Sequence, residues 1–380
     1  MPLAVVGFVL LAAVIVMTVA PARLVADKCR QRDGDACVGG RIEAPYAVVP
    51  GAAEAVAPRL SFVSVKRYDS AGQLLFVTVR EPALTMLEWF VSRRERSVQP
   101  LSQDEAHPPQ LTPSEQRQAD VQAMVTAKQK AEYVALSKLG YPARVIPGPV
   151  VVDQVGCLEA DESRTKCLTP VPAAAVLQHG DKILAVDGRA IGDADVLREV
   201  LSAHQIGDHV MVELARGGET RSGDVALISS REEQPRAILG IGTVDTRTVE
   251  TPFDIGIQTD EIGGPSAGLA FTLTILDELT PGSITGGVDV AVTGTIDLDG
   301  TVGPIGGLPS KTEAVKQTGA TVFIVPAAQG EAELAAARAV AGAGLRIVTV
   351  GNLDEALAAL ADLGGNALGL GTPGAGYAAS

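Results

Sequence analysis

The stretch Gly263-Gly264-Pro265-Ser266-Ala267-Gly268, and the apolar run that follows it to Leu279, decide how this chain is interpreted. The glycines allow a sharp turn and a close approach of a second backbone. We expect a largely buried helix from Ala267 to Leu279, with Ser266 at its N-terminal end. Backbone N–H groups are unpaired there, and the helix dipole favours the negative charge of an oxyanion. Taken alone, the motif fits a serine that merely caps the helix.

A serine nucleophile needs a base, and the surrounding sequence offers lysine for that role. The chain has four histidines, and none of them lies within 235–363. This segment contains two lysines, of which Lys311 follows Gly-Gly-Leu-Pro-Ser at the start of an expected helix. As a base it would need its pKa lowered by about three units, through burial and nearby positive potential. An ordinary solvated lysine is the alternative.

The order of these motifs resembles the proteolytic domain of the Lon (S16) peptidases over roughly 235–363. Gly-Pro-Ser-Ala-Gly is followed by Thr-Gly-Thr-Ile at 293–296, by the glycine-rich run 300–308 and by Lys311. The resemblance implies an α+β serine endopeptidase with Ser266 as nucleophile and Lys311 as base. It implies that Gly264 and Ala267 support the turn, and that Thr293 supports the lysine.

Two positions differ from the Lon pattern. Many Lon proteins have an acidic residue where Gly263 stands, and Pro309 replaces a commonly charged residue. Neither change touches the expected Ser-Lys dyad. A strand threonine with no catalytic role is the alternative for Thr293.

Alternating patterns between 235 and 363 predict a mixed helix and strand domain. A hairpin turn is expected at Asp299-Gly300. The expected helices cover 267–279, 311–319, 331–341 and 353–363, and the expected strands cover 253–257, 288–296, 321–325 and 346–350.

Within 144–228 we expect a short helix near Pro172, then Gly-Asp-Lys-Ile-Leu-Ala-Val-Asp-Gly at 180–188, and an amphipathic helix at 193–203. This order resembles bacterial PDZ domains. The resemblance implies a β-rich domain that adds a peptide as an extra strand at a sheet edge. A spacer or an oligomer contact is the alternative role, and the loop between Cys157 and Cys167 departs from the family pattern.

Residues 1–22 predict a transmembrane anchor. The apolar run from Leu3 to Ala20 would span about 27 Å as a helix, close to the thickness of a bilayer core. A cleaved signal peptide is the alternative, because Ala20-Pro21-Ala22 fits a cleavage site. A juxtamembrane and helical linker region is expected over 23–143, with two strands around a turn at 69–72 and a helix over 112–139. A flexible tail is expected over 364–380.

The four cysteines form two local pairs, Cys29 with Cys37 and Cys157 with Cys167. They are candidates for two disulfides in an oxidising compartment, with free thiols as the alternative. Their spacing does not suit a metal site, and we expect neither a metal nor a cofactor. The expected location is therefore the cell membrane, with a single span and the remaining domains extracytoplasmic.

The net charge and the lack of a nucleotide-binding motif exclude some classes of function. A formal net charge of -14 excludes nucleic-acid binding through phosphates. No Gly-x-x-x-x-Gly-Lys-Ser/Thr motif occurs, so we expect an ATP-independent endopeptidase that cleaves unfolded or flexible proteins at the outer face of the membrane. Its partners would be protein or peptide substrates and the membrane, with a homo-oligomer as one option. The alternatives are a catalytically inert, membrane-tethered peptide-binding scaffold and a glycine-rich phosphate cradle.

Overall fold

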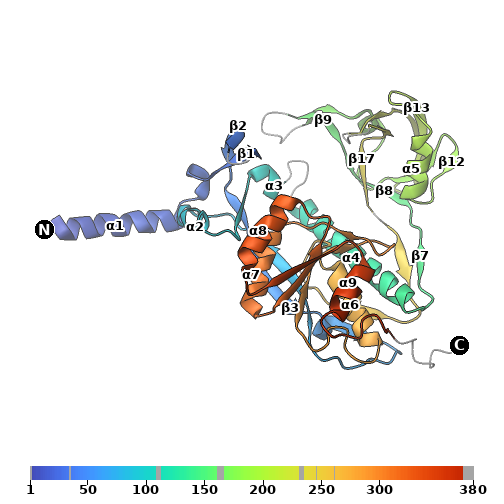
Figure 1. Ribbon diagram of the computed structural model, residues 1–380. Helices are drawn as coiled ribbons and strands as arrows, with labels where there is room; N and C mark the ends of the chain where they lie inside the picture. The colour runs from blue at the N-terminus through green and yellow to red at the C-terminus, as the bar shows by residue number, and fades with distance from the viewer. Residues whose placement is uncertain are drawn as a thin grey trace. The chain divides into compact units, whose positions relative to one another are not determined.

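The chain forms two compact units (Figure 1). The computed structural model describes residues 2–33, 36–107, 113–160, 167–230, 235–244, 246–260 and 262–370. Unit 1 combines Met1–Ala143 with Thr251–Ser380, and unit 2 is the inserted segment Arg144–Glu250. The nucleophile motif therefore belongs to a unit that is built from both ends of the chain.

Unit 1 is organised around a six-stranded mixed sheet of order β24-β23-β20-β5-β3-β6. The first four of these strands are parallel, whereas β3 and β6 continue the sheet in antiparallel pairs. In the register, Val292 of β20 lies between Phe76 of β5 and Ile324 of β23. The strands are β3 (Tyr46–Ala55), β5 (Leu74–Arg80), β6 (Gln99–Leu101), β20 (Val290–Val292), β23 (Val322–Pro326) and β24 (Arg346–Val350).

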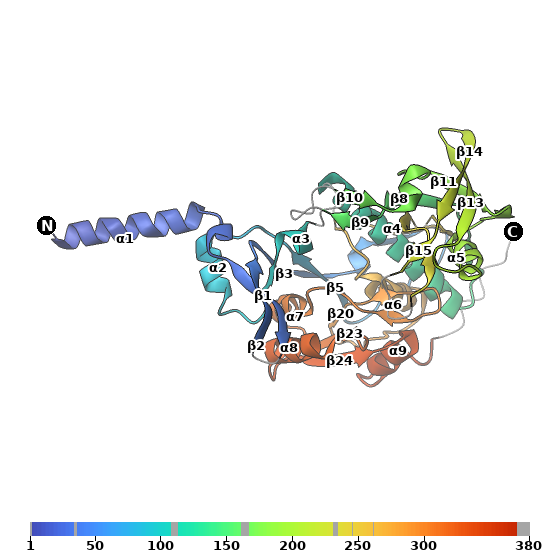
Figure 2. The same ribbon diagram turned by 90° about the horizontal axis from the view of Figure 1, so that it is seen from above.

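Helices cover both faces of this sheet (Figure 2). Successive residues of a strand point to opposite faces, so Phe76 packs in one core while Leu75 and Val77 pack in the other. The first core contains residues of α4, α6 and α9, and the second contains residues of α7 and α8. The helices are α4 (Pro113–Lys138), α6 (Gly268–Leu279), α7 (Leu308–Thr318), α8 (Glu331–Ala341) and α9 (Leu353–Ala361). Parallel strands need such cover on both faces, which explains their near-continuous apolar sequences.

Short elements complete unit 1. A hairpin of β21 and β22 follows β20, and β4 pairs with β19. Ala367 is buried in the first core, so part of the predicted flexible tail packs against the domain; residues 371–380 lie outside the described part. The remaining elements are η1 (Ala22–Leu24), β1 (Asp27–Asp33), β2 (Ala36–Glu43), η2 (Ala57–Arg59), β4 (Leu60–Phe62), α2 (Met86–Ser92), α3 (Gln103–Ala106), β19 (Ile255–Ile257), β21 (Thr295–Ile296) and β22 (Val302–Gly303).

The predicted linker over 23–143 is wrong in its main point. Its strand β5 lies inside the sheet, between β20 and β3, and its helix α4 packs against α6. The two strands around the turn at 69–72 do not pair with each other, because β4 joins β19 and β5 joins β20 and β3. The N-terminal region is therefore part of the domain that carries the nucleophile motif.

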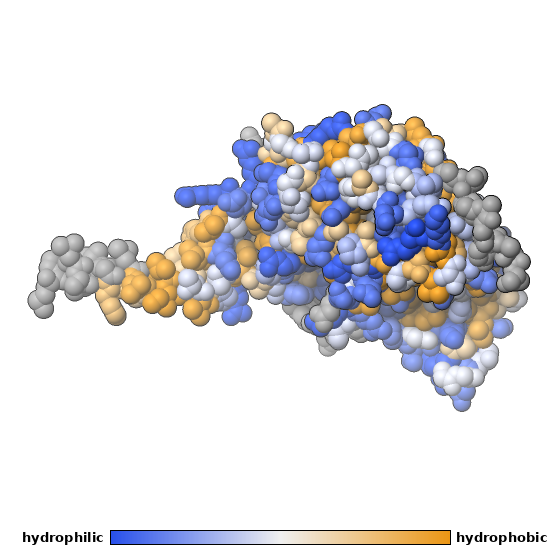
Figure 3. Space-filling view, turned by 90° about the horizontal axis from the view of Figure 1, so that it is seen from below, coloured by the Kyte–Doolittle hydropathy of each residue, from blue (hydrophilic) through white to orange (hydrophobic). Residues whose placement is uncertain are grey.

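Helix α1 (Pro2–Val19) carries exposed apolar side chains, as the orange surface along its described part shows (Figure 3). Within the described residues, no helix combines the length and the apolar character needed to cross a membrane. The predicted transmembrane anchor over 1–22 is not supported.

Unit 2 has its own core and a β-rich fold. Its sheet has the order β14-β13-β11-β8-β17, with β12 paired to β11, and α5 packs its buried face against it. Asp187 and Gly188 both have positive φ, which is the backbone of the predicted tight Asp-Gly turn between β11 and β12. The elements are β7 (Arg144–Ile146), β8 (Val150–Val155), β9 (Cys157–Ala160), β10 (Cys167–Pro170), η3 (Pro172–Ala175), β11 (Lys182–Val186), β12 (Arg189–Ala190), α5 (Ala194–Ser202), β13 (His209–Arg216), β14 (Glu219–Ala226), β15 (Ile228–Ser229), β16 (Ala237–Ile238), β17 (Ile241–Val244) and β18 (Thr248–Glu250).

This unit is longer than the predicted 144–228, because β17 pairs with β8 and β18 pairs with β7. Asp181, from the Gly-Asp pair of the motif, is buried and accepts two hydrogen bonds from Arg216, at 2.7 and 2.6 Å. These bonds hold the pKa of Asp181 below its usual value and join β13 to the turn before β11.

Candidate active site

The turn that carries Ser266 requires glycine at two positions. Gly264 has a φ of 84°, in the left-handed region, and its N–H donates to the carbonyl oxygen of Asp120 on α4 at 2.9 Å. A Cβ at Gly263 would lie 2.7 Å from the Cβ of Asp120. The close contact with α4 therefore leaves no room for a side chain at position 263.

Ser266 does not cap the helix that follows it. The N-cap of α6 is Ala267, which makes no side-chain cap bond. The carbonyl oxygen of Ser266 accepts hydrogen bonds from the N–H of Gly294, at 2.9 Å, and from the Oγ1 of Thr293, at 3.2 Å. The backbone of Ser266 is thereby fixed to the segment after β20, and its hydroxyl is left for another partner.

That partner is Lys311, in the first turn of α7. The Nζ of Lys311 lies 2.6 Å from the Oγ of Ser266, although the two residues are 45 positions apart in the sequence. The same nitrogen lies 3.1 Å from the Oγ1 of Thr293. The structure thus brings together Ser266, Lys311 and Thr293, the three side chains that the sequence singled out.

The Lys311 amine is almost completely removed from water, with 2% of the residue exposed. Burial, one of the two causes expected from the sequence, lowers its pKa from 10.5 to about 7. Across the described parts of the chain, no carboxylate forms an ion pair with this amine. A substantial fraction of Lys311 is therefore uncharged at neutral pH and can accept a proton.

Two backbone N–H groups at the nucleophile turn have no acceptor within the described residues: those of Ser266 and Ala267. They lie at the N-terminal end of α6, where the helix dipole adds positive potential. The N–H of Gly264 is already bonded to Asp120, so Gly264 contributes the shape of the turn. Together these groups can stabilise an oxyanion.

The cysteines form the two predicted pairs. Cys29 is joined to Cys37, and Cys157 is joined to Cys167 across the β9–β10 hairpin. No group of three or more metal-binding side chains occurs among the described residues.

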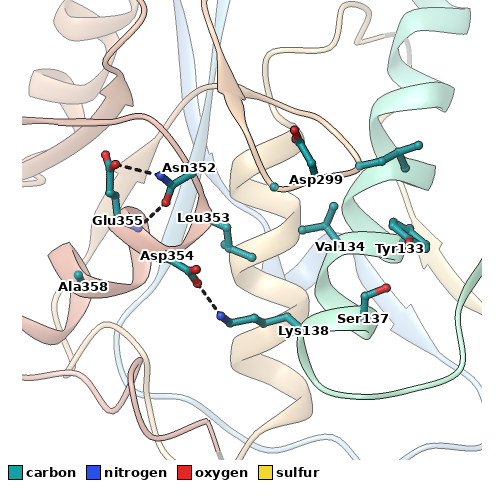
Figure 4. Close-up of a pocket in the computed structure, with 12 residues that line it drawn as sticks. Tyr133, Val134, Ser137, Lys138, Asp299, Asn352, Leu353, Asp354, Glu355 and Ala358 are labelled. Atoms are coloured by element: carbon teal, nitrogen blue, oxygen red, sulfur yellow. Dashed lines mark hydrogen bonds and ion pairs between the residues drawn. The ribbon is translucent and has the colours of Figure 1, made fainter.

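A separate pocket of about 760 Å³ lies between the end of α4 and the start of α9 (Figure 4). Ser266, Thr293 and Lys311 are not among its lining residues. Lys138 of α4 and Asp354 of α9 join the two walls at 2.5 Å, and Asn352 donates to Glu355 at 2.9 Å within the α9 wall (Figure 4). No sequence pattern predicted this pocket, because its α4 and α9 walls come from segments more than 200 residues apart.

The contribution of the N-terminal region to this site was also not predicted from the sequence. Asp120 supports the nucleophile turn through a backbone carbonyl, which carries no sequence signature. Glycines at 263 and 307 are the signal that could have revealed it, because each marks a close approach by a residue before 143.

Comparison with known protein families gives two matches. Residues 256–362 match the C-terminal proteolytic domain of Lon protease (S16), and residues 167–227 match the PDZ domain. The first match contains Ser266, Thr293 and Lys311, and the second lies within unit 2.

Curated relatives carry the name Lon protease. Lon protease 2 of Herpetosiphon aurantiacus is 32% identical over 196 residues, which is 50% of this chain and 22% of the relative. Lon protease of Xanthomonas oryzae is 32% identical over 139 residues, or 37% of this chain and 16% of the relative. Lon protease 1 of Sorangium cellulosum is 37% identical over 95 residues, which is 25% of this chain and 11% of the relative. The chain thus spans less than a quarter of the length of these relatives.

Among solved structures, the PDZ domain of the SdrC-like protein from Listeria monocytogenes is 26% identical. It covers 27% of this chain and 94% of its own, with a TM-score of 0.21. A solution structure of a protein from Geobacillus thermodenitrificans is 25% identical. The match covers 25% of this chain and 95% of that one, with a TM-score of 0.20.

Proposed function

We propose that this chain, which carries a Lon-type (S16) proteolytic domain and a PDZ domain, is a serine endopeptidase with a Ser266–Lys311 dyad. The observation that carries the proposal is the 2.6 Å approach of the buried Lys311 amine to the Ser266 hydroxyl. A lysine in an ordinary structural role would keep its amine in water or pair it with a carboxylate.

The reaction is acyl transfer to Ser266. The lone pair of neutral Lys311 accepts the hydroxyl proton while Oγ attacks a peptide carbonyl carbon. The resulting oxyanion is stabilised by the N–H groups of Ser266 and Ala267. The Lys311 ammonium then gives its proton to the leaving amine, and the C–N bond breaks to leave an ester on Ser266. Water, deprotonated by Lys311, hydrolyses this ester and restores both side chains.

Thr293 orients the base in this scheme. Its Oγ1 accepts a hydrogen bond from the Lys311 amine and donates one to the carbonyl oxygen of Ser266. With one N–H of the neutral amine directed at Thr293, its lone pair can take the position that faces Ser266. Thr293 is a positioning residue in this account.

The substrates we propose are unfolded or flexible polypeptides, and cleavage does not require ATP. The basis is the lack of a phosphate-binding Gly-x-x-x-x-Gly-Lys-Ser/Thr motif in the 380 residues. Unit 2 would bind a peptide as an added strand beside β17. Among the described strands, β17 lies at one edge of its sheet. An extracytoplasmic, oxidising location is supported by the two disulfides.

Cleavage of casein by the full chain, without ATP, tests the proposal. We expect wild type to release peptides, while Ser266→Ala and Lys311→Ala release none although both stay folded. Lys316→Ala is the matched control, because Lys316 lies on the same helix, is exposed and pairs with Glu313. Casein cleavage by purified Lys311→Ala would refute the dyad, and an inactive wild type would favour the inert peptide-binding scaffold.

A further inference from the structure

Ser310, the residue before Lys311, has a hydroxyl group that the proposed reaction does not use. Ser310 is completely buried in the first turn of α7. Its Oγ lies 3.1 Å from the carbonyl oxygen of Val48 on β3, and it also bonds to the carbonyl oxygen of Ser97, between α2 and β6. Both acceptors lie in the N-terminal region, outside the segment that matches the Lon proteolytic domain.

The start of α7 is pressed closely against β3. Gly307, the N-cap of α7, has a φ of 71°, and a Cβ there would lie 2.8 Å from a methyl carbon of Val48. The helix packs along both β3 and β5. The height of the first turn above the sheet is therefore set by contacts with Val48, and Lys311 belongs to that turn.

The Ser310 hydroxyl is the polar part of this contact. Its single O–H is shared between the carbonyl oxygens of Val48 and Ser97, and removing it would leave these oxygens without that donor in a buried place, which is unfavourable. The structure can relieve this only if the turn shifts or water enters beside it. Either change would partly hydrate the neighbouring Lys311 amine, whose pKa is lowered by its burial.

We propose that Ser310 is a positioning residue that binds the first turn of α7 to β3 and to Ser97 and so keeps the Lys311 amine dry. This inference rests on the proposed function, in which Lys311 is the base. It makes the N-terminal region a working part of the active site, since the acceptors of Ser310 come from 46–101.

Thr312 provides a matched control on the same helix. It is also completely buried, but its hydroxyl donates within α7, to the carbonyl oxygen of Leu308 at 2.8 Å. Thr312→Val removes a buried hydroxyl at nearly constant volume and removes no hydrogen bond to β3. A general loss of stability would affect both variants, whereas hydration of Lys311 would affect only Ser310→Ala.

The test is the pH dependence of kcat/KM for casein-derived peptide cleavage by the full chain. In wild type we expect activity to rise through about pH 7. In Ser310→Ala this rise should move up by about one pH unit, with about fivefold less activity at pH 7 and nearly full activity at pH 9. Thr312→Val should follow wild type. A Ser310→Ala profile that superimposes on wild type, or that falls equally at every pH, would overturn the inference.

A second measurement separates this inference from the proposed function. The pKa of Lys311 can be followed by NMR of the lysine ε-carbon, with Lys311→Met to assign the resonance. It should rise in Ser310→Ala but not in Thr312→Val, even if wild type cleaves nothing. Should Ser310→Ala fail to fold, Ser310→Cys replaces the hydroxyl with a much weaker donor, so the Lys311 pKa should still rise, and an unchanged pKa in that variant would count against the inference.

Discussion

The polar atoms nearest to the Lys311 amine belong to two hydroxyl groups, those of Ser266 and Thr293. Hydroxyl groups orient an amine but compensate little for a buried positive charge. The protein therefore stabilises the uncharged form of Lys311, which is the form a base needs. A buried carboxylate at this place would have had the opposite effect and raised the pKa of the lysine.

The same burial predicts how stability depends on pH. Below about pH 7 Lys311 is protonated in the folded and the unfolded chain, so folding carries the full penalty of a buried charge. Between about pH 7 and 10.5 the unfolded chain binds more protons, so the stability contributed by this residue rises by up to about 1.4 kcal/mol per pH unit. Lys311→Met should therefore stabilise the protein most near pH 6, and this gain should shrink toward pH 10.

Urea unfolding of the full chain at pH 6, 8 and 10 checks this. Lys316→Met is the control, because Lys316 is exposed and its loss should change stability little at any of these pH values. A gain for Lys311→Met that does not vary with pH would contradict the low pKa.

The elements after residue 251 could be predicted closely, because each has a local signal. The helix expected over 331–341 is α8 at the same bounds, and the strand expected over 346–350 is β24. The helix that contains Lys311 begins earlier than expected, at Leu308, because Pro309 fits the first turn. The site could be predicted for a similar reason, since its motifs occupy the ends of these elements.

The role of the N-terminal strands could not be predicted. β5 is as apolar as a core strand, but its parallel partner, β20, lies more than 200 residues away in the sequence. A sequence pattern can show that a strand is buried on both faces, but it does not identify the strand that pairs with it. The acceptors of Ser310 were hidden for the same reason, because they are backbone atoms of Val48 and Ser97.

The contact between α7 and β3 predicts different effects at two neighbouring glycines. Gly307→Ala places a Cβ 2.8 Å from Val48 at a positive φ, so it should destabilise unit 1 by about 1–3 kcal/mol. Gly306→Ala meets no atom within 4 Å and should change stability by less than about 0.5 kcal/mol. Urea unfolding of both variants measures the difference, and equal stabilities would contradict the close packing.

At the scale of the whole molecule, the two units differ in whether their folding needs distant segments of the chain. Unit 2 is one continuous segment with its own core, whereas unit 1 needs β3, β5 and α4 from before residue 143. A fragment of 144–250 should therefore unfold cooperatively on heating, and a fragment of 251–380 should show no cooperative transition. Circular dichroism melting checks both, and a cooperative transition for 251–380 would show that the N-terminal strands are dispensable.

The central claim is that an uncharged Lys311 activates Ser266 in the folded chain. Mass spectrometry after reaction with a hydroxyl-directed phosphonate at pH 8 tests it most directly. The account predicts one phosphonylated residue, Ser266, in wild type and in Lys316→Met, with labelling of Lys311→Met reduced at least about a hundredfold. Folded wild type that stays unlabelled at Ser266, or Lys311→Met that is labelled as fast as wild type, would contradict it.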